Sequence, residues 1–100
     1  MKRQPYIYVL ACEDNTYYVG FTRWLHLRLQ AHFLGHGAWF TKEHKPLSVL
    51  MYRKAIDEEC EYNAWRKFAD QFGYKRVGGY NPSLCEKFGF EWPYYNGTMK

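Results

Sequence analysis

The stretch YIYVLACEDNTYYVGFT, from Tyr6 to Thr22, decides the fold of this 100-residue chain. Its two flanks, YIYVLAC and YYVGF, have the alternating pattern and the aromatic content that are typical of β-strands. The segment EDNT between them favours a turn, because Asp and Asn side chains hydrogen-bond nearby backbone groups. The stretch therefore predicts a β-hairpin with a loop from Glu13 to Asn15.

The hairpin register determines which tyrosine side chains share a face. A loop at Glu13–Asn15 gives three facing pairs: Cys12 with Thr16, Leu10 with Tyr18, and Tyr8 with Gly20. Tyr8 and Tyr18 then lie diagonally on one face, and Gly20 leaves room beside the Tyr8 ring. A slip of one residue would separate the two hydroxyls. The tyrosines are either ordinary packing residues of a strand pair or two hydroxyls that are brought together for chemistry.

Three further elements follow the hairpin. The segment RWLHLRLQAHFL predicts a helix ended by Gly35 and Gly37, with Arg28 and His32 between two apolar sectors. LSVLMYR predicts a third strand, and its continuous apolar run predicts burial on both faces. A second helix over DEECEYNAWRKFADQF ends at Gly73, with one apolar stripe at Cys60, Ala64, Phe68 and Phe72 and with Trp65 and Ala69 beside it.

These elements define the expected fold class. The order β-β-α-β-α predicts a small α/β (α+β) domain, a three-stranded antiparallel sheet flanked by helices. We expect a single domain over residues 1–100 with a core at about 6–73, because the chain contains no repeat and no linker. The turn-rich residues 74–100 predict an irregular covering segment.

Composition narrows the classes of function. The chain is 47% hydrophobic and 21% aromatic, and its net charge of +4 favours a polyanionic partner. Its three cysteines, Cys12, Cys60 and Cys85, are widely spaced, which argues against a disulfide framework and a cysteine-rich zinc site. The apolar run near the N-terminus is too short for a signal peptide or a membrane span. We therefore expect an intracellular, cytoplasmic protein without a membrane partner.

Two tyrosine motifs carry a specific resemblance. Tyr6-Ile7-Tyr8 and Tyr18-Val19-Gly20, followed by Arg28 and His32 on the next helix, resemble the GIY-YIG nuclease family over roughly Tyr6 to Phe72. Tyr6 stands in place of the first glycine of the family motif, and Val19 in place of an isoleucine. Both substitutions keep strand character. Phe21 stands where the repair-nuclease branch carries a lysine, so assistance from that position is absent here.

The resemblance implies a metal-dependent DNA endonuclease, structure-selective or weakly sequence-specific, acting in DNA repair, recombination or processing. It implies catalytic roles for five residues: Tyr8, Tyr18, Arg28, His32 and Glu61. One Mg²⁺ (or Mn²⁺) is expected on Glu61, because EYNAWRK is similar to the family pattern around the metal-binding glutamate. The apolar residues that usually precede that glutamate are replaced here by Asp57 and Glu58, which leaves Glu59 as the second candidate.

DNA contacts are expected from the loop GHGAWFTKEHKP, which is similar to the basic, glycine-rich loop of the family. Its candidate DNA-binding residues are Trp39, Phe40, Lys42, His44 and Lys45. An alternative phosphate track consists of Arg66, Lys67, Lys75 and Arg76. Two other interpretations stay open. One is a catalytically silent nucleic-acid-binding module of the same fold, and the other is a structural zinc site of His32, His36, His44 and Cys60.

Overall fold

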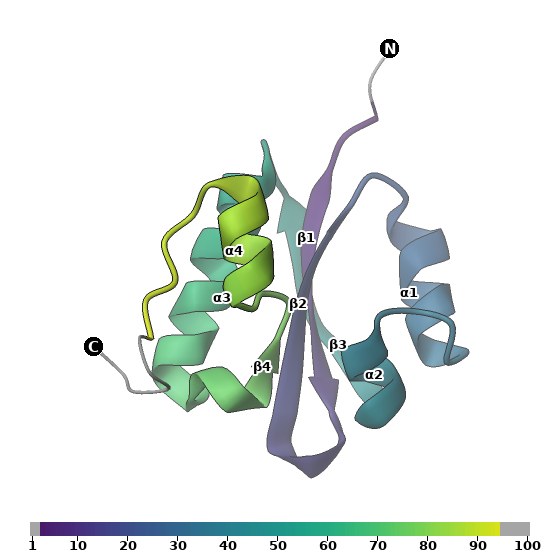
Figure 1. The fold of residues 1–100 in the computed structure, drawn as a ribbon. Coiled ribbons are helices and arrows are strands. Elements are labelled where there is room, and N and C mark those ends of the chain that lie inside the picture. The colour runs from purple at the N-terminus through teal and green to yellow at the C-terminus, as the bar shows by residue number, and fades with distance from the viewer. Residues whose placement is uncertain (1–2, 95–100) are drawn as a thin grey trace.

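The computed structural model describes residues 3–94 (Figure 1). The strands are β1 (Tyr6–Cys12), β2 (Thr16–Thr22), β3 (Pro46–Lys54) and β4 (Val77–Gly78). The helices are α1 (Leu25–Phe33), α2 (Trp39–Glu43), α3 (Glu58–Phe72) and α4 (Pro82–Phe88). Two single 3-10 turns, η1 (Glu13–Asn15) and η2 (Tyr74–Arg76), complete the element order.

The sheet has four strands in the order β3-β1-β2-β4. β1 pairs antiparallel with β2 and β3, whereas β2 pairs parallel with β4. The α+β class is confirmed, but the prediction of a three-stranded antiparallel sheet is wrong, because a fourth strand makes the sheet mixed. β4 is only two residues long, which is too short to produce the alternation by which strands are recognised in a sequence.

The predicted hairpin register is confirmed. Cys12 faces Thr16, Leu10 faces Tyr18, and Tyr8 faces Gly20. The loop makes its tight turn with φ of 64° at Asp14 and 55° at Asn15. Asp and Asn adopt this left-handed conformation more readily than other residues with a side chain, which explains why EDN closes the hairpin.

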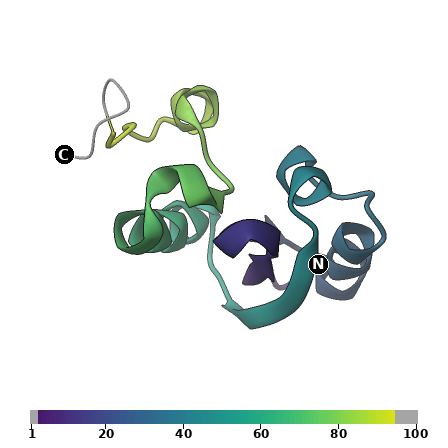
Figure 2. The same ribbon diagram turned by 90° about the horizontal axis from the view of Figure 1, so that it is seen from below.

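β1 is the central strand and is buried on both faces. Ile7 and Val9 are 0% exposed and belong to the core beneath α3, while Tyr8 and Leu10 belong to a second cluster with Leu25 and Leu29 of α1. Viewed from below, α3 and α4 lie on one side of the sheet and α1 and α2 on the other (Figure 2). The hairpin therefore separates a large aromatic core from a smaller cluster that contains Tyr8.

Helix α3 is confirmed, and its buried face is centred on the residues predicted to lie beside the stripe. Asp57 caps the helix by accepting hydrogen bonds from the backbone nitrogens of Glu59 and Cys60, and Gly73 follows its last turn. The fully buried residues are Tyr62, Ala64, Trp65 and Ala69, whereas Cys60, Phe68 and Phe72 only pack against the core. Trp65 is the centre of this face, and its indole Nε1 donates to the carbonyl of Val77 at 3.1 Å.

Two burial predictions are wrong. β3 is an edge strand, and its side chains Leu47, Leu50 and Tyr52 are exposed instead of buried on both faces. Of the two apolar sectors predicted for the first helix, the one with Trp24, Leu27, Ala31 and Leu34 is mostly exposed instead of buried. Leu25 and Leu29 of the other sector pack against the cluster that contains Tyr8. α3 packs mainly on β1, β2 and β4. An apolar run in the sequence cannot distinguish a central strand from an edge strand.

Residues 74–94 of the C-terminal segment pack on the core, and they are not irregular. β4 and α4 lie within it, and it places Tyr80, Cys85 and Tyr94 in the core. Helix α4 is capped by the Asn81 side chain, which accepts from the Leu84 backbone nitrogen at 2.8 Å, and begins with Pro82. Residues 95–100 of the predicted covering segment lie outside the described residues. None of the helices within residues 3–94 is long and apolar enough to cross a membrane.

The burial of the C-terminal segment leads to a stability prediction. A chain that ends at Gly73 loses four buried core side chains, those of Val77, Tyr80, Cys85 and Tyr94. Large apolar side chains contribute about 1.5–3 kcal/mol each on burial, so their summed loss approaches a typical unfolding free energy of about 5–15 kcal/mol. We expect the truncated chain to lose its cooperative thermal transition in circular dichroism. A retained transition near that of the full chain would show that residues 6–73 fold without it.

Candidate active site

The candidate site begins with Tyr8 on β1 and Gly20 on β2. The Tyr8 side chain is 1% exposed, and its ring lies directly over Gly20. A Cβ atom at position 20 would lie 2.3 Å from the Tyr8 hydroxyl oxygen, well inside contact distance. The predicted role of Gly20 as the residue that leaves room for Tyr8 therefore has a direct steric basis.

His32 of α1 closes the other side of Tyr8. The Tyr8 hydroxyl oxygen lies 2.6 Å from His32 Nε2, and the His32 side chain is 0% exposed. Tyr18 completes the group, with its ring centroid 5.0 Å from that of His32 and 6.3 Å from that of Tyr8. Three rings from β1, β2 and α1 therefore meet on one face of the sheet.

Burial controls the protonation of these rings. Burial raises the pKa of Tyr8 far above its usual range, and the charge of the Arg28 guanidinium partly opposes this. Burial also raises the pKa of Tyr18, and the charge of Arg28 again opposes the shift. The pKa of His32 is lowered to about 4, first by burial and then by Arg28. Near neutral pH both phenols are thus protonated, and His32 is neutral.

Glu61 of α3 belongs to the same electrostatic group, although α3 covers the other face of the sheet. Its charge contributes to the raised pKa of both Tyr8 and Tyr18, although burial is the larger cause in each case. Burial raises the pKa of Glu61 itself to about 7, and a hydrogen bond from the Tyr80 hydroxyl to Oε1 at 3.1 Å opposes the shift. Glu59, the second candidate, is exposed. This geometry favours Glu61 over Glu59.

The residues present fit one divalent cation. Glu61 is a half-buried carboxylate, and within residues 3–94 no cationic side chain forms an ion pair with it. Mg²⁺ typically binds one or two carboxylates and completes its coordination with water and substrate phosphate. An all-protein cage is absent, since the described residues contain no group of three or more His, Cys, Asp or Glu side chains that could hold a metal.

The structural zinc interpretation has no support among the described residues. Both ring nitrogens of His32 are in hydrogen bonds, to Tyr8 and to Thr41. His44 contacts Asp14 through Nδ1 at 3.1 Å. These partners account for two of the four proposed ligands without a metal.

The predicted DNA-binding residues on α2 and the following loop lie in different environments. Trp39 is 72% exposed, and Lys42 and Lys45 are exposed as well, so these three side chains can contact a ligand. Phe40 instead packs inward: a Cβ atom on Gly78 would lie 2.4 Å from its ring. His44 is partly buried and stacks near Phe40, with ring centroids 4.9 Å apart.

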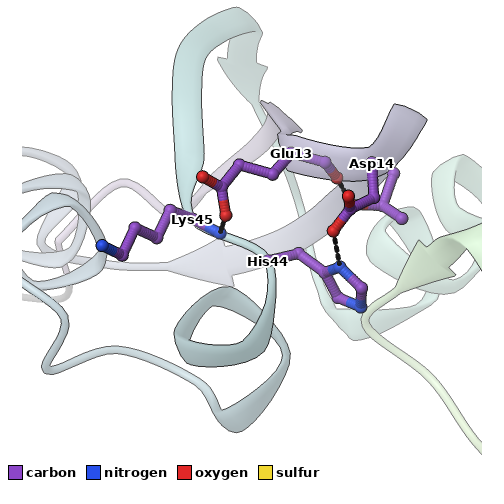
Figure 3. Close-up of polar contacts among 5 residues, drawn as sticks. Glu13, Asp14, His44 and Lys45 are labelled. Carbon is purple, nitrogen blue, oxygen red and sulfur yellow. Dashed lines mark hydrogen bonds and ion pairs between the residues drawn. The ribbon is translucent and has the colours of Figure 1, made fainter.

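The hairpin turn holds this loop in place. The backbone nitrogen of Lys45 donates to the Glu13 carboxylate at 3.1 Å, and the backbone nitrogen of Glu13 donates to the Lys45 carbonyl at 2.9 Å. Asp14 and His44 add a second connection (Figure 3). In Figure 3 the Lys45 side chain extends away from both acidic residues. The turn therefore fixes the backbone of the loop while the lysine amine stays available.

Two hollows border the candidate site. The larger, of about 710 Å³, lies between α2 and α4 and is lined by residues that include Tyr18, Trp39, Phe40, Lys75 and Tyr80. The smaller, of about 470 Å³, is lined by residues that include His32, Thr41, Lys42 and Lys45. Arg28 and Glu61 line neither hollow, but Tyr18 and Tyr80 connect the larger one to the tyrosine pair and to Glu61.

Sequence reasoning missed two residues of this site. Tyr80 binds Glu61, and Thr41 binds His32 through its hydroxyl at 2.8 Å from Nδ1. Tyr80 follows the Gly78-Gly79 pair in the segment predicted to be irregular, and Thr41 lies between Phe40 and Lys42 in the loop read as a DNA contact. Neither position belongs to a pattern that indicates a contact with the site.

Comparison with known proteins agrees with this geometry. The family model of the GIY-YIG catalytic domain matches residues 4–72, so the chain belongs to the GIY-YIG family. It is 41% identical over 58 residues to a UPF0213 protein of Oceanobacillus iheyensis, which covers 58% of this chain and 67% of the relative. A UPF0213 protein of Bacillus pumilus is 32% identical over 72 residues, covering 66% of this chain and 74% of the relative. No solved structure matches the chain.

The raised pKa of Glu61 predicts how stability depends on pH in metal-free protein. A carboxyl whose pKa rises from 4.5 to about 7 on folding stabilises the fold fully below pH 4.5, and this contribution is lost as the pH rises to about 7. Glu61→Gln removes the ionisation. We expect its melting temperature in EDTA to match the parent near pH 4.5 and to exceed it by several degrees at pH 8.

The matched control for this measurement is Glu59→Gln, which removes one carboxylate from an exposed position on the same helix. It should follow the parent across the pH range. If Glu61→Gln and Glu59→Gln shift the melting temperature equally at pH 8, Glu61 carries no burial cost in the folded state.

Proposed function

We propose that this chain is a metal-dependent DNA endonuclease that hydrolyses phosphodiester bonds. The observation that carries the proposal is the contact of the Tyr8 hydroxyl with a buried, neutral His32, beside Tyr18, Arg28 and Glu61. Membership of a catalytic-domain family supports an enzyme of this type. The net charge of +4 supports a polyanionic substrate.

Tyr8 and His32 are suited to transfer a proton. A phenol with a raised pKa is a weak base by itself, because its own proton must leave first. Neutral His32 offers a nitrogen 2.6 Å from the Tyr8 oxygen. In the proposed step the Tyr8 oxygen takes a proton from the attacking water while the Tyr8 proton passes to His32 Nε2. Tyr18, whose ring neighbours both, helps to orient that water.

Arg28 and Glu61 supply the complementary charges. Arg28 is partly exposed beside the two tyrosines and presents a planar fork of donors that matches the oxygens of a phosphate. Glu61 would hold the divalent cation, and that cation, when bound, would stabilise negative charge on the departing oxygen. The negative charge of Glu61 and the positive charge of Arg28 thus flank the tyrosine pair.

One observation favours a second candidate function, a silent nucleic-acid-binding module of the same fold. Tyr8 is 1% exposed and His32 is 0% exposed, so in this structure neither meets solvent directly. Such a module would bind through Tyr18, Trp39 and the exposed lysines without cleavage. An activity measurement separates the two functions.

The test is a cleavage panel of labelled duplex, branched, nicked and single-stranded DNAs, with Mg²⁺ or Mn²⁺ and with EDTA. We expect metal-dependent cleavage of at least one DNA, with structure-selective or weakly sequence-specific cutting as the proposed preference. Binding without cleavage by folded protein, in either metal, would establish the silent module instead.

Substitutions at the site should separate catalysis from binding. Arg28→Ala and Tyr8→Phe should each lower the cleavage rate by ~10²-fold or more, the usual size of effect for a lost transition-state donor or proton-transfer group. Glu61→Gln should abolish cleavage while DNA binding persists, because it removes a negative charge near the phosphate. Glu59→Gln is the matched control and should cut like the parent. If Glu59→Gln is inactive and Glu61→Gln still cleaves DNA, Glu59 and not Glu61 is the metal ligand.

The exposed lysines after Trp39 should contribute to affinity instead of catalysis. Each phosphate contact changes the slope of log K against log salt by about −0.9 on duplex DNA, so the double variant Lys42→Ala, Lys45→Ala should bind more weakly with a slope shallower by about 2. The double variant Arg66→Ala, Lys67→Ala makes the same charge change on α3. If that pair changes the slope and the loop pair does not, the phosphate track runs along α3.

A further inference from the structure

His32 is held by two hydrogen bonds, and the geometry at Thr41 determines which ring nitrogen carries the proton. Thr41 Oγ1 lies 2.8 Å from His32 Nδ1 and 2.9 Å from the carbonyl oxygen of Ala38. A carbonyl only accepts, so the Thr41 hydroxyl donates its single hydrogen to Ala38. Towards His32 the Thr41 oxygen can then only accept, and Nδ1 carries the hydrogen.

The position of the hydrogen on the His32 ring also sets the direction of the hydrogen bond to Tyr8. A neutral imidazole has one hydrogen, so Nε2 has a free lone pair when Nδ1 is protonated. At 2.6 Å the Tyr8 hydroxyl must therefore donate to Nε2. We infer that Thr41 is a positioning residue, which fixes His32 in the Nδ1–H tautomer and directs the Tyr8 O–H toward Nε2. The catalytic meaning of this inference rests on the proposed nuclease function.

The surroundings of Nδ1 favour Thr41 as its acceptor. His32 and Thr41 are 0% and 1% exposed, so both polar groups need a partner inside the protein. The backbone at Gly37 covers the ring from outside: a Cβ atom there would lie 2.3 Å from Nδ1. Loss of the Thr41 hydroxyl would leave a buried N–H unsatisfied, which costs more than the net value of one hydrogen bond.

Helix α2 holds Thr41 in this position. Both the backbone nitrogen of Thr41, at 3.1 Å, and its hydroxyl, at 2.9 Å, bind the Ala38 carbonyl at the start of the helix. These contacts place the Thr41 oxygen beside the Ala38 carbonyl. If the hydroxyl donated to His32 instead, the two oxygens would lie 2.9 Å apart with no hydrogen between them. The loop that also carries Trp39 and Lys42 thus supplies a residue that acts on the catalytic pair.

The opposite tautomer would work against the proposed proton transfer. With the hydrogen on Nε2, His32 would donate to the Tyr8 oxygen and could not accept the Tyr8 proton. Tyr8 would then keep its proton, because its pKa is already raised by burial. In serine hydrolases the residue that holds the histidine in the required tautomer contributes up to ~10⁴ in kcat. A weaker neutral partner such as threonine should contribute less, on the order of 10-fold to 10²-fold.

The direct test is the ¹⁵N NMR spectrum of the histidine side chains in the metal-free 100-residue chain at pH 7. In the parent we expect His32 with Nδ1 protonated and Nε2 bare. Thr41→Val removes the acceptor at nearly constant volume and should move the population to the Nε2–H form, while Thr41→Ser should restore Nδ1–H. The matched control is Thr16→Val, which removes another buried hydroxyl, one that donates to the Glu13 carbonyl at 2.6 Å.

The outcomes separate this inference from the nuclease proposal. An Nε2–H tautomer in the parent overturns the inference, and this holds even if Thr41→Val does not fold. Nδ1–H retained in folded Thr41→Val overturns it as well, as does an equal tautomer shift in Thr16→Val.

In the cleavage assay, Thr41→Val should lower kcat about 10-fold or more with KM little changed, and Thr41→Ser should recover the rate. If the parent cleaves no DNA, the proposed function fails while the tautomer result still stands.

Discussion

A buried hydroxyl must be hydrogen-bonded, and the Tyr8 hydroxyl is the buried group around which this side of the protein is arranged. It requires a hydrogen-bond partner, which His32 supplies from α1, and it requires space, which Gly20 supplies from the neighbouring strand. His32 in turn needs its own partner on α2. A single phenol on the central strand thus connects the hairpin with both helices on its face of the sheet.

The two faces of the sheet carry different kinds of side chain. On one face, Trp65 and the aromatic residues around it form the larger of the two core clusters. On the other face, polar rings replace part of the apolar contacts that a core would normally have. Glu61 connects the two sides, since it starts from the packing helix and yet influences Tyr8 and Tyr18. Within residues 3–94 no cationic side chain forms an ion pair with Glu61, so its burial costs stability, and such a cost is common at ligand-binding sites.

The structural features that could be predicted depend on residues that are close together in the sequence. Turn residues at Glu13–Asn15 fixed the hairpin length, and the two-residue period of a strand then placed Tyr8 opposite Gly20. The exposure of β3 and the presence of a fourth strand were not predictable in this way, because the edge position of β3 and the two-residue β4 depend on tertiary pairing. Asn81, Pro82 and Gly89 are typical residues for the two ends of a helix, and they do mark α4. The same residues are also typical of turns, which is what the turn-rich segment predicted. Tyr80 and Thr41 approach the site through tertiary contacts, which no local pattern records.

The parallel pairing of β4 with β2 also affects the order in which the chain can assemble. The hairpin closes over a three-residue loop, whereas β4 reaches Tyr17 only after α1, α2, β3 and α3 have been made. Contacts between segments so distant in sequence carry a loop-closure entropy that is recovered only when the core forms around them. We therefore expect the first two strands to pair early and the Trp65 core to be sealed in a late step. Until β4 and α4 join it, the aromatic face of α3 is exposed in a growing chain, and exposed apolar surface of this kind favours aggregation.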